Sequence, residues 1–140
     1  MKFNTKTYEE LFEEIFGDLA RKYNLKIKKT TEDSMSLISD GYILLIGIFV
    51  AGTNVQYIDL RNKKVYDLSD YIVMKTTDKD REGFYAQKII TDIVETSLRI
   101  RNNSLKNNFS DLLAGNNKWF YEYKNSGYFW EKSFRSELLI

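Results

Sequence analysis

The first segment of the chain places apolar and acidic residues at helical spacing. The apolar positions fall on one side of a helix and the glutamates fall on the other. Thr7 and Glu10 have the spacing of a capping box, in which each side chain accepts a hydrogen bond from the other residue's backbone N–H. We therefore expect an amphipathic helix from Thr7 to Tyr23, with Asn24 as its C-terminal cap. The apolar positions are Tyr8, Leu11, Phe12, Ile15, Phe16, Leu19 and Tyr23, and the acidic ones are Glu9, Glu10, Glu13 and Glu14.

The pattern then changes to short apolar stretches separated by turn residues, which is typical of strands. Asp40-Gly41 is a strong hairpin signal, and Arg61 to Lys64 separates two later stretches as another hairpin. The longest apolar run, Tyr42 to Ala51, is apolar on both faces, so we expect a central strand that helices cover on both sides. The expected strands are Leu25 to Thr31, a stretch around Met35 and Leu37, Tyr42 to Ala51, Val55 to Leu60 and Val65 to Leu68.

Helical spacing returns in the second half of the chain. Apolar residues between Phe84 and Leu98 repeat at this spacing and predict a long helix from about Arg81 to Asn102. Leu68 to Met74 fits either a short helix or the end of a strand. The remaining expected segments are a short helix over Phe109 to Ala114 that Gly115 ends, a helix over Trp119 to Lys124, and a closing segment from Tyr128 to Ile140.

Together these elements predict an α+β fold: an N-terminal amphipathic helix, an antiparallel meander of about five strands, then C-terminal helices packing on the sheet. The chain shows no internal repeat, low-complexity tract or linker, so we expect one globular domain over residues 1–140. Its longest apolar run is about half the roughly 20 residues that a membrane helix needs. Lys2 and Lys6 lead into polar residues instead of the apolar stretch of a secretory signal. We therefore expect a soluble, cytoplasmic protein.

The composition excludes most familiar enzyme chemistries. The 140 residues include no histidine and no cysteine. This excludes histidine or thiolate metal sites, a Ser-His-Asp triad, a thiol nucleophile and a disulfide. The net charge of +1 provides no overall field to gather nucleic acid or an anionic membrane. We expect a protein without metal or cofactor that acts by binding and is not an enzyme; an enzyme that uses carboxylates, tyrosine and lysine is a further alternative.

Two short motifs resemble ligand-binding loops but lack an essential residue. Residues 78–83 open like a calcium-binding loop, but Ile89 occupies the position that must supply a bidentate carboxylate. Gly47 and Gly52 have the glycine spacing of a phosphate-binding loop without its lysine. We interpret the first as a charged loop that places Asp80 at the start of the following helix, and the second as part of a buried strand.

Aromatic and basic residues are interleaved near the C-terminus. Such a mixture can bind single-stranded nucleic acid by stacking. We favour a second interpretation, in which Trp119 and Tyr123, one helical turn apart, are core residues, and so are Trp130 and Phe134. A protein interface is the third, because tryptophan and tyrosine often anchor such surfaces. The residues are Trp119, Phe120, Tyr121, Tyr123, Tyr128, Phe129, Trp130 and Phe134, with Lys118, Lys124, Lys132 and Arg135.

The order of these segments resembles a known class of bacterial protein. Its features are the acidic leading helix from Thr7 to Tyr23, the strands Tyr42-Ile-Leu-Leu-Ile-Gly-Ile and Val55-Gln-Tyr-Ile-Asp-Leu, the helix start Asp80-Arg81-Glu82-Gly83-Phe84, and the segments Phe109-Ser-Asp-Leu-Leu-Ala-Gly115 and Asn117-Lys-Trp-Phe. This whole-chain plan resembles small immunity proteins encoded beside contact-dependent growth inhibition and other polymorphic toxins. The resemblance implies an inhibitor that binds one cognate toxin domain and blocks its active site or the access of its substrate.

An inhibitor of this kind can use exposed acids to occupy a basic cleft and to speed association. The candidate partner-binding residues are therefore Glu9, Glu13, Asp78 and Asp80. The expected partner is a toxin domain, and no contact with a membrane is expected. The alternative function is that of a nucleic-acid-binding accessory protein that uses the aromatic and basic C-terminal segment.

Overall fold

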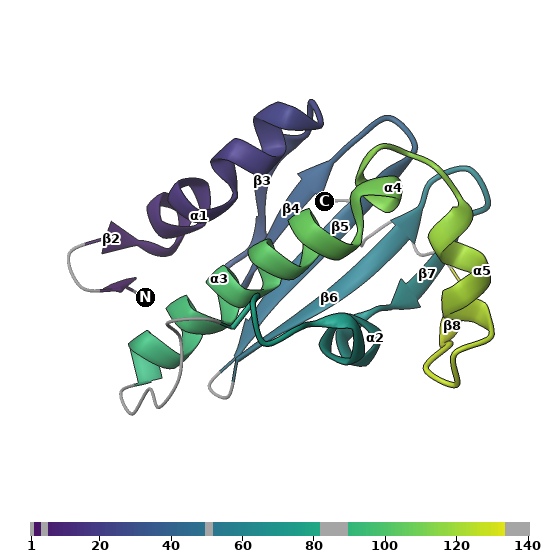
Figure 1. Ribbon diagram of the computed structural model, residues 1–140. Helices are drawn as coiled ribbons and strands as arrows, with labels where there is room; N and C mark the ends of the chain where they lie inside the picture. Colours follow the sequence, from purple (N-terminus) through teal and green to yellow (C-terminus); the bar gives the residue numbers. More distant parts are fainter. Residues whose placement is uncertain (1, 4–5, 50–51, 82–89, 134–140) are drawn as a thin grey trace.

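The structure is a computed structural model and describes residues 2–3, 6–49, 52–81 and 90–133 (Figure 1). It has the α+β fold that the sequence predicts, with a helix before a sheet and further helices after it. The helices are α1 (Tyr8–Lys22), α2 (Ser69–Lys75), α3 (Ile90–Asn108), α4 (Ser110–Leu113) and α5 (Lys118–Lys124). The strands are β1 (Lys2–Phe3), β2 (Lys6–Thr7), β3 (Lys26–Thr31), β4 (Ser34–Ile38), β5 (Tyr42–Phe49), β6 (Gly52–Asp59), β7 (Lys64–Asp67) and β8 (Glu131–Ser133).

The main sheet has six antiparallel strands in the order β3-β4-β5-β6-β7-β8, so each strand pairs with its neighbours in the chain. The first five are the meander that the sequence predicts. The sixth, β8, comes from the C-terminal segment and pairs with β7 through Val65 and Lys132. Its three residues, Glu131 to Ser133, are polar and carry no alternating pattern, which is why it was not expected. β1 and β2 form a separate two-stranded pair.

Local sequence signals set both ends of α1. The Glu10 backbone N–H donates to Thr7 Oγ1 at 3.2 Å, and the Thr7 N–H donates to Glu10 Oε1 at 3.4 Å, which confirms the capping box. At the other end Asn24 has a left-handed φ of 56°, a conformation that asparagine tolerates better than most residues. The chain can therefore reverse direction and enter β3.

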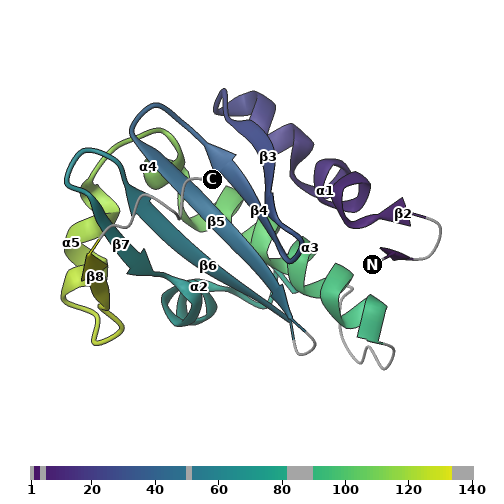
Figure 2. The same ribbon diagram turned by 180° about the vertical axis from the view of Figure 1, so that it is seen from behind.

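The core lies between one face of the sheet and the helices (Figures 1 and 2). Leu37, Leu44, Tyr57 and Tyr66 stand side by side in adjacent strands and share this face. They belong to one apolar cluster that includes buried residues from all five described helices. The burial of this cluster removes water from the apolar side chains of helices and strands together, which is the main favourable term in folding.

The opposite face of the sheet differs from the expectation that helices cover the central strand on both sides. Ile43, Ile58 and Val65 form a second, smaller apolar cluster there, with Leu45 and Leu60 around it. Among the described helices, none lies over this face (Figure 2). The described helices therefore cover β5 on one side only, although its sequence is apolar on both sides.

Two helices differ from the expectation. The long helix is expected to begin at about Arg81, which the structure places in a turn; residues 82–89 lie outside the described part of the chain, and α3 continues past Asn102 to Asn108. Ser104 and Leu105 are fully buried there, so tertiary packing outweighs the weak helix propensity of the Asn102-Asn103-Ser104 stretch. Residues 69–75 are helical, which decides between the two readings of that segment. Among the described residues, no helix is both long and apolar enough to cross a bilayer.

Candidate functional site

The four acidic residues singled out from the sequence do not lie together. Glu9 and Glu13 are exposed on the outer face of α1, and Glu9 Oε1 lies 3.4 Å from Lys29 Nζ on β3. Asp78 is exposed in the segment after α2. Asp80 is only 1% exposed, so the structure removes it from the candidate partner-binding surface.

Asp80 has an internal role instead. Its carboxylate accepts hydrogen bonds from the Thr77 backbone N–H at 2.9 Å, from Asn107 Nδ2 at 2.7 Å and from Asn108 Nδ2 at 2.9 Å. Burial works to raise the pKa of Asp80, but these hydrogen bonds favour the charged form and hold the pKa below its usual value. The carboxylate thus ties the segment after α2 to the C-terminal end of α3.

The aromatic C-terminal segment divides into a buried and an exposed part. Trp119 and Tyr123 are core residues, as expected, at 5% and 0% exposure. Trp130 is 49% exposed, so the expectation that it is buried is wrong; it precedes a strand rather than lying in a helix. Phe134 lies outside the described residues. The exposed aromatic residues, which we call the aromatic surface, are Tyr121, Tyr128, Phe129 and Trp130.

A buried hydroxyl fixes the backbone of the aromatic surface. Tyr123 Oη lies 2.9 Å from the Asp67 carbonyl and accepts a hydrogen bond from the Trp130 backbone N–H at 3.0 Å. Burial raises the pKa of Tyr123, so the hydroxyl keeps its proton and can donate to Asp67. The Asp67 N–H in turn donates to the Trp130 carbonyl at 3.3 Å. The aromatic surface is therefore held against β7.

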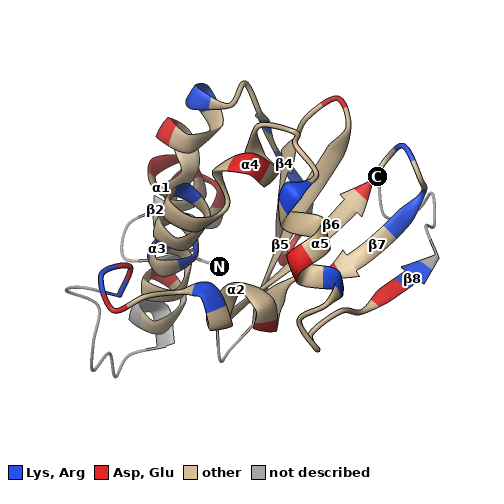
Figure 3. Cartoon of the chain, turned by 45° about the vertical axis from the view of Figure 1, so that its right-hand side comes forward, with Lys and Arg blue, Asp and Glu red and all other residues tan. Residues whose placement is uncertain are grey.

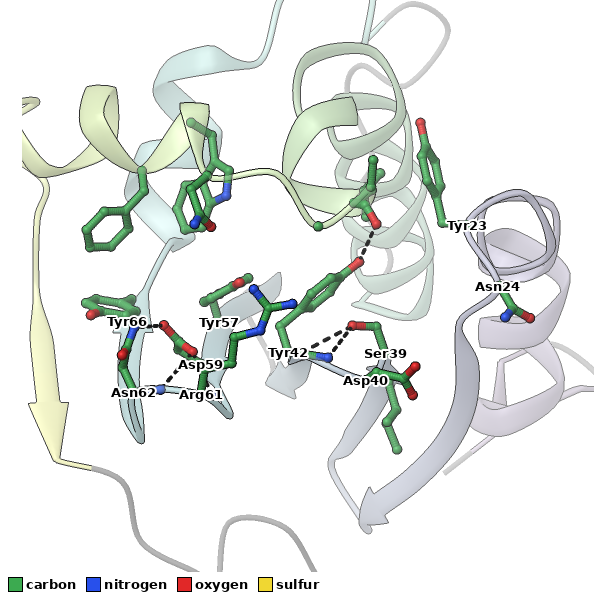
Figure 4. A pocket seen from close by; sticks show the side chains of 18 of the residues that line it. Tyr23, Asn24, Ser39, Asp40, Tyr42, Tyr57, Asp59, Arg61, Asn62 and Tyr66 are labelled. Carbon is green, nitrogen blue, oxygen red and sulfur yellow. Dashed lines mark hydrogen bonds between the residues drawn. The ribbon is translucent and has the colours of Figure 1, made fainter.

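A cavity of about 770 Å³ opens at one end of the sheet, on the helix side (Figure 4). Four separate parts of the chain enclose it: the turn after α1, the β4–β5 hairpin, the β6–β7 hairpin and the segment from α4 to α5. Aromatic side chains supply much of its wall. They are Tyr23, Tyr42, Tyr57, Tyr66, Trp119, Phe120 and Tyr121.

The hydrogen bonds around this cavity fix its walls. Tyr42 Oη donates to the Leu113 carbonyl at 2.9 Å, which joins the first residue of β5 to the end of α4. Asp59 accepts hydrogen bonds from the backbone N–H groups of Arg61 and Asn62, at 2.9 and 3.1 Å, and so shapes the β6–β7 turn. These hydrogen bonds hold the β6–β7 turn and the end of α4 in place around the cavity.

Tyr42 and Tyr57 in the wall keep their protons at ordinary pH. Burial, with a contribution from Asp59, raises the pKa of Tyr57 to about 12, and the nearby Arg61 only partly opposes this shift. Burial likewise raises the pKa of Tyr42 well above its usual value. Both shifts move away from neutrality, whereas general acid–base catalysis is served best by a pKa near the working pH. The wall therefore offers protonated hydroxyls suited to hydrogen bonding.

Metal binding has little support from the residues present. The chain has no histidine or cysteine, and the described residues contain no group of three or more acidic side chains placed to hold a metal ion. Carboxylates alone would have to supply the ligands. The chemistry that the described arrangement supports best is binding through aromatic, hydroxyl and guanidinium groups.

Sequence reasoning missed the cavity because its walls come from distant segments. Tyr23, Gly41, Arg61 and Trp119 are far apart in the chain and become neighbours of one space only in the folded protein. The two hairpin signals did place Gly41 and Arg61 in turns. The predicted antiparallel meander also brings these two turns to the same end of the sheet. What the sequence does not indicate is that the segment from α4 to α5 lies over this end.

Comparison with known proteins assigns no family to this chain. No protein-family model matches the sequence, and neither a curated protein nor a solved structure matches it significantly.

Proposed function

We propose that this protein is an immunity protein: it binds one toxin domain and neutralises it by covering the active site or by blocking access of the substrate. The whole-chain plan, with its acidic first helix and its meander, supports this proposal. The observation that carries it is the aromatic surface, because such residues are the usual anchors of protein interfaces. The proposed function requires binding and no catalysis, and it places the protein in the cytoplasm of the cell it protects.

Seven large apolar side chains are exposed among the described residues, and four of them belong to the aromatic surface. Trp130 is 49% exposed and Tyr121 is 75% exposed, whereas the core cluster holds most of the other large apolar side chains. An exposed group of aromatic residues costs solvation free energy and often marks an interaction site. A partner that covers these residues would recover that free energy.

The aromatic surface is also fixed before any partner arrives. The Tyr123 hydroxyl and the pairing of β8 with β7 hold the backbone at Trp130. Because a prearranged surface loses less conformational entropy on binding, more of the contact energy appears as affinity. This favours a tight complex, as an inhibitor requires.

The acidic helix has a different part in the proposal. α1 lies at the opposite end of the molecule from α5 and β8 (Figures 1 and 2), and acidic residues mark its surface (Figure 3). In a contact centred on the aromatic surface, Glu9 and Glu13 lie outside the interface. Their negative electrostatic field then attracts a basic partner and speeds its approach. Asp80 has no part in it, because it is buried.

Coexpression tests the proposal. The toxin domain encoded beside this protein is produced in bacterial cells together with the wild-type protein or with one of two variants. Trp130→Ala removes an anchor of the aromatic surface, and the matched control Val73→Ala truncates an apolar residue that is 50% exposed on α2. We expect the wild type and Val73→Ala to restore growth and to form a one-to-one complex. We expect Trp130→Ala to lose protection while remaining folded.

Two results would contradict the proposal. One is growth arrest when both wild-type proteins are produced in folded form. The other is full protection by Trp130→Ala, which would remove the aromatic surface from the interface even if another face binds the toxin.

Binding of single-stranded nucleic acid is the second candidate function, and one contact favours it. Lys132 Nζ lies 5.6 Å from the centre of the Trp130 ring, so a charge and a stacking surface stand together. This function predicts affinity for a single-stranded oligonucleotide that falls steeply as salt rises. The immunity function predicts a protein complex that persists at moderate salt.

A further inference from the structure

The cavity at the end of the sheet has the size of a small-molecule site. Its volume of about 770 Å³ lies within the range of roughly 300–1,000 Å³ in which such sites usually fall. Its wall combines aromatic rings, which can bury a ligand ring, with many polar and charged side chains, which can fix the orientation of a charged ligand.

One charged side chain of this cavity, Arg61, is exposed and therefore accessible to a ligand. Figure 4 shows the Arg61 side chain rising from the β6–β7 turn toward Tyr57 and Tyr42. Its guanidinium lies over Gly41, where an added Cβ would stand 3.1 Å from Nη2. Among the described residues, the guanidinium forms no ion pair and donates no hydrogen bond; the hydrogen bond of Arg61 to Asp59 comes from its backbone N–H. Arginine presents a planar fork of N–H donors that matches a carboxylate or a phosphate.

The negative charges in the wall do not satisfy Arg61. Lys26, Arg61 and Lys124 line the cavity against Asp40 and Asp59. The carboxylate of Asp59 is already engaged in the turn: its Oδ1 accepts from two backbone N–H groups and its Oδ2 accepts from the Asn62 side chain at 2.9 Å. The balance of charge in the wall is therefore positive.

The rings of the wall form a surface suited to a planar group. Tyr42 and Tyr57 are stacked, with ring centres 5.3 Å apart and planes 19° apart. Trp119 meets Tyr57 edge to face at 4.9 Å. A ligand ring in the cavity can extend such offset and edge contacts, each of which adds to the free energy of burial.

An unpaired donor in the wall is the second sign of a ligand. Trp119 is 5% exposed, and its indole Nε1 is buried without a hydrogen-bond partner. Buried N–H groups are nearly always paired, because an unpaired donor loses its hydrogen bond to water without replacement.

We propose that this cavity binds a small molecule in which a planar ring carries a carboxylate or a phosphate. Arg61 holds the anionic group, and the ring lies against Tyr57 and the neighbouring rings. This site shares Tyr121 with the aromatic surface, but binding of a small molecule here does not require the proposed toxin contact.

Two simple probes, benzoate and phenyl phosphate, test the site and distinguish the two anionic groups. The chain has two tryptophans, so the ¹H–¹⁵N spectrum of the protein contains two indole signals, which the Trp130→Phe variant assigns. We expect at least one probe to shift the Trp119 signal in a saturable way while the Trp130 signal moves little. Benzylamine, which has the ring with a positive group, and cyclohexanecarboxylate, which has the anion without an aromatic ring, should bind more weakly.

The Arg61→Gln variant decides the role of the guanidinium. We expect it to weaken the better probe about tenfold or more, the usual result of losing a charged hydrogen-bonding pair. The matched control Lys106→Gln removes an exposed positive charge from the end of α3 and should leave the affinity unchanged.

The proposal is overturned if neither anionic probe gives a saturable shift at millimolar concentration. It is also overturned if benzylamine binds as well as benzoate, or if Arg61→Gln, folded as judged by its spectrum, keeps the wild-type affinity.

Discussion

The two ends of the molecule differ in whether their apolar residues are buried or exposed. At α1 the apolar stripe of the helix is buried, and the outward face carries acidic side chains. At α5 and β8 two aromatic residues, Trp119 and Tyr123, are buried, whereas the aromatic surface remains exposed. The first end is fully explained by folding, since every apolar residue of the helix has a place in the core. The second is not, because folding alone would favour covering those rings.

This difference separates residues that maintain the fold from residues that are free to serve binding. Removing a buried ring from α1 should damage stability, whereas removing an exposed ring near β8 should change binding and leave stability nearly intact.

The largest effect is expected at Phe12. Its ring is fully buried and stacks on Phe16 with centres 4.4 Å apart. Phe12→Ala should lower the free energy of unfolding by about 3–5 kcal/mol, because it removes buried surface and leaves a cavity. Trp130→Ala, its counterpart at the other end, should change stability by only about 0.5 kcal/mol. Urea denaturation measures both, and equal losses would mean that the two ends do not differ as described.

An intermediate effect is expected at Asp80, which belongs to neither surface. Asp80→Asn should cost about 1–3 kcal/mol at neutral pH, because the hydrogen bonds from Thr77, Asn107 and Asn108 favour a charged carboxylate. The pKa of Asp80 is lowered in the folded protein, so acid protonates the unfolded chain first. Its contribution is therefore present above the ordinary aspartate pKa of 3.8 and is lost as pH falls through the folded pKa.

Stability measured against pH checks this prediction. The wild type should lose stability in acid more steeply than Asp80→Asn, while Asp40→Asn, which changes an exposed carboxylate, should follow the wild type. Parallel curves for the wild type and Asp80→Asn would show that the Asp80 carboxylate does not contribute in its charged form.

The smallest effect under ordinary conditions is expected at Tyr57. Burial raises its pKa from 10.0 to about 12, so the unfolded chain loses this proton first as pH rises. The resulting stability is present below pH 10 and is lost as pH rises toward the folded value. Tyr57→Phe should therefore match the wild type near neutral pH and lose less stability in this alkaline range.

Tyr121→Phe is the control, because Tyr121 is 75% exposed. Thermal unfolding at several alkaline pH values measures the difference. If both variants resist alkali equally, burial of Tyr57 is not the cause.

The sequence predicts well what local signals determine. α1 begins at its capping box and ends at Lys22, just before the left-handed Asn24, because both features depend on residues within a few positions of each other. The hairpin signals and apolar stretches likewise identify the strands of the meander. Their order in the sheet follows from the simplest connection of neighbouring strands.

The sequence predicts poorly what distant contacts determine. β8 exists because β7 offers an edge to pair with, not because Glu131 to Ser133 favour a strand. The helical spacing of Trp130 and Phe134 therefore misled the prediction of burial. The cavity depends on how the α4–α5 segment lies over two hairpin turns, a placement set by packing that no single segment encodes.

The order of the sheet also has a consequence for how fast the protein folds. Every strand from β3 to β8 pairs with the strands next to it along the chain, and only the partnership of β7 with β8 closes a long loop. Short loops cost little entropy to close, and chains rich in local contacts fold quickly. The first five strands can thus pair in the order in which a ribosome produces them. The slowest folding step should be the docking of α3, α4, α5 and β8 on this preformed meander.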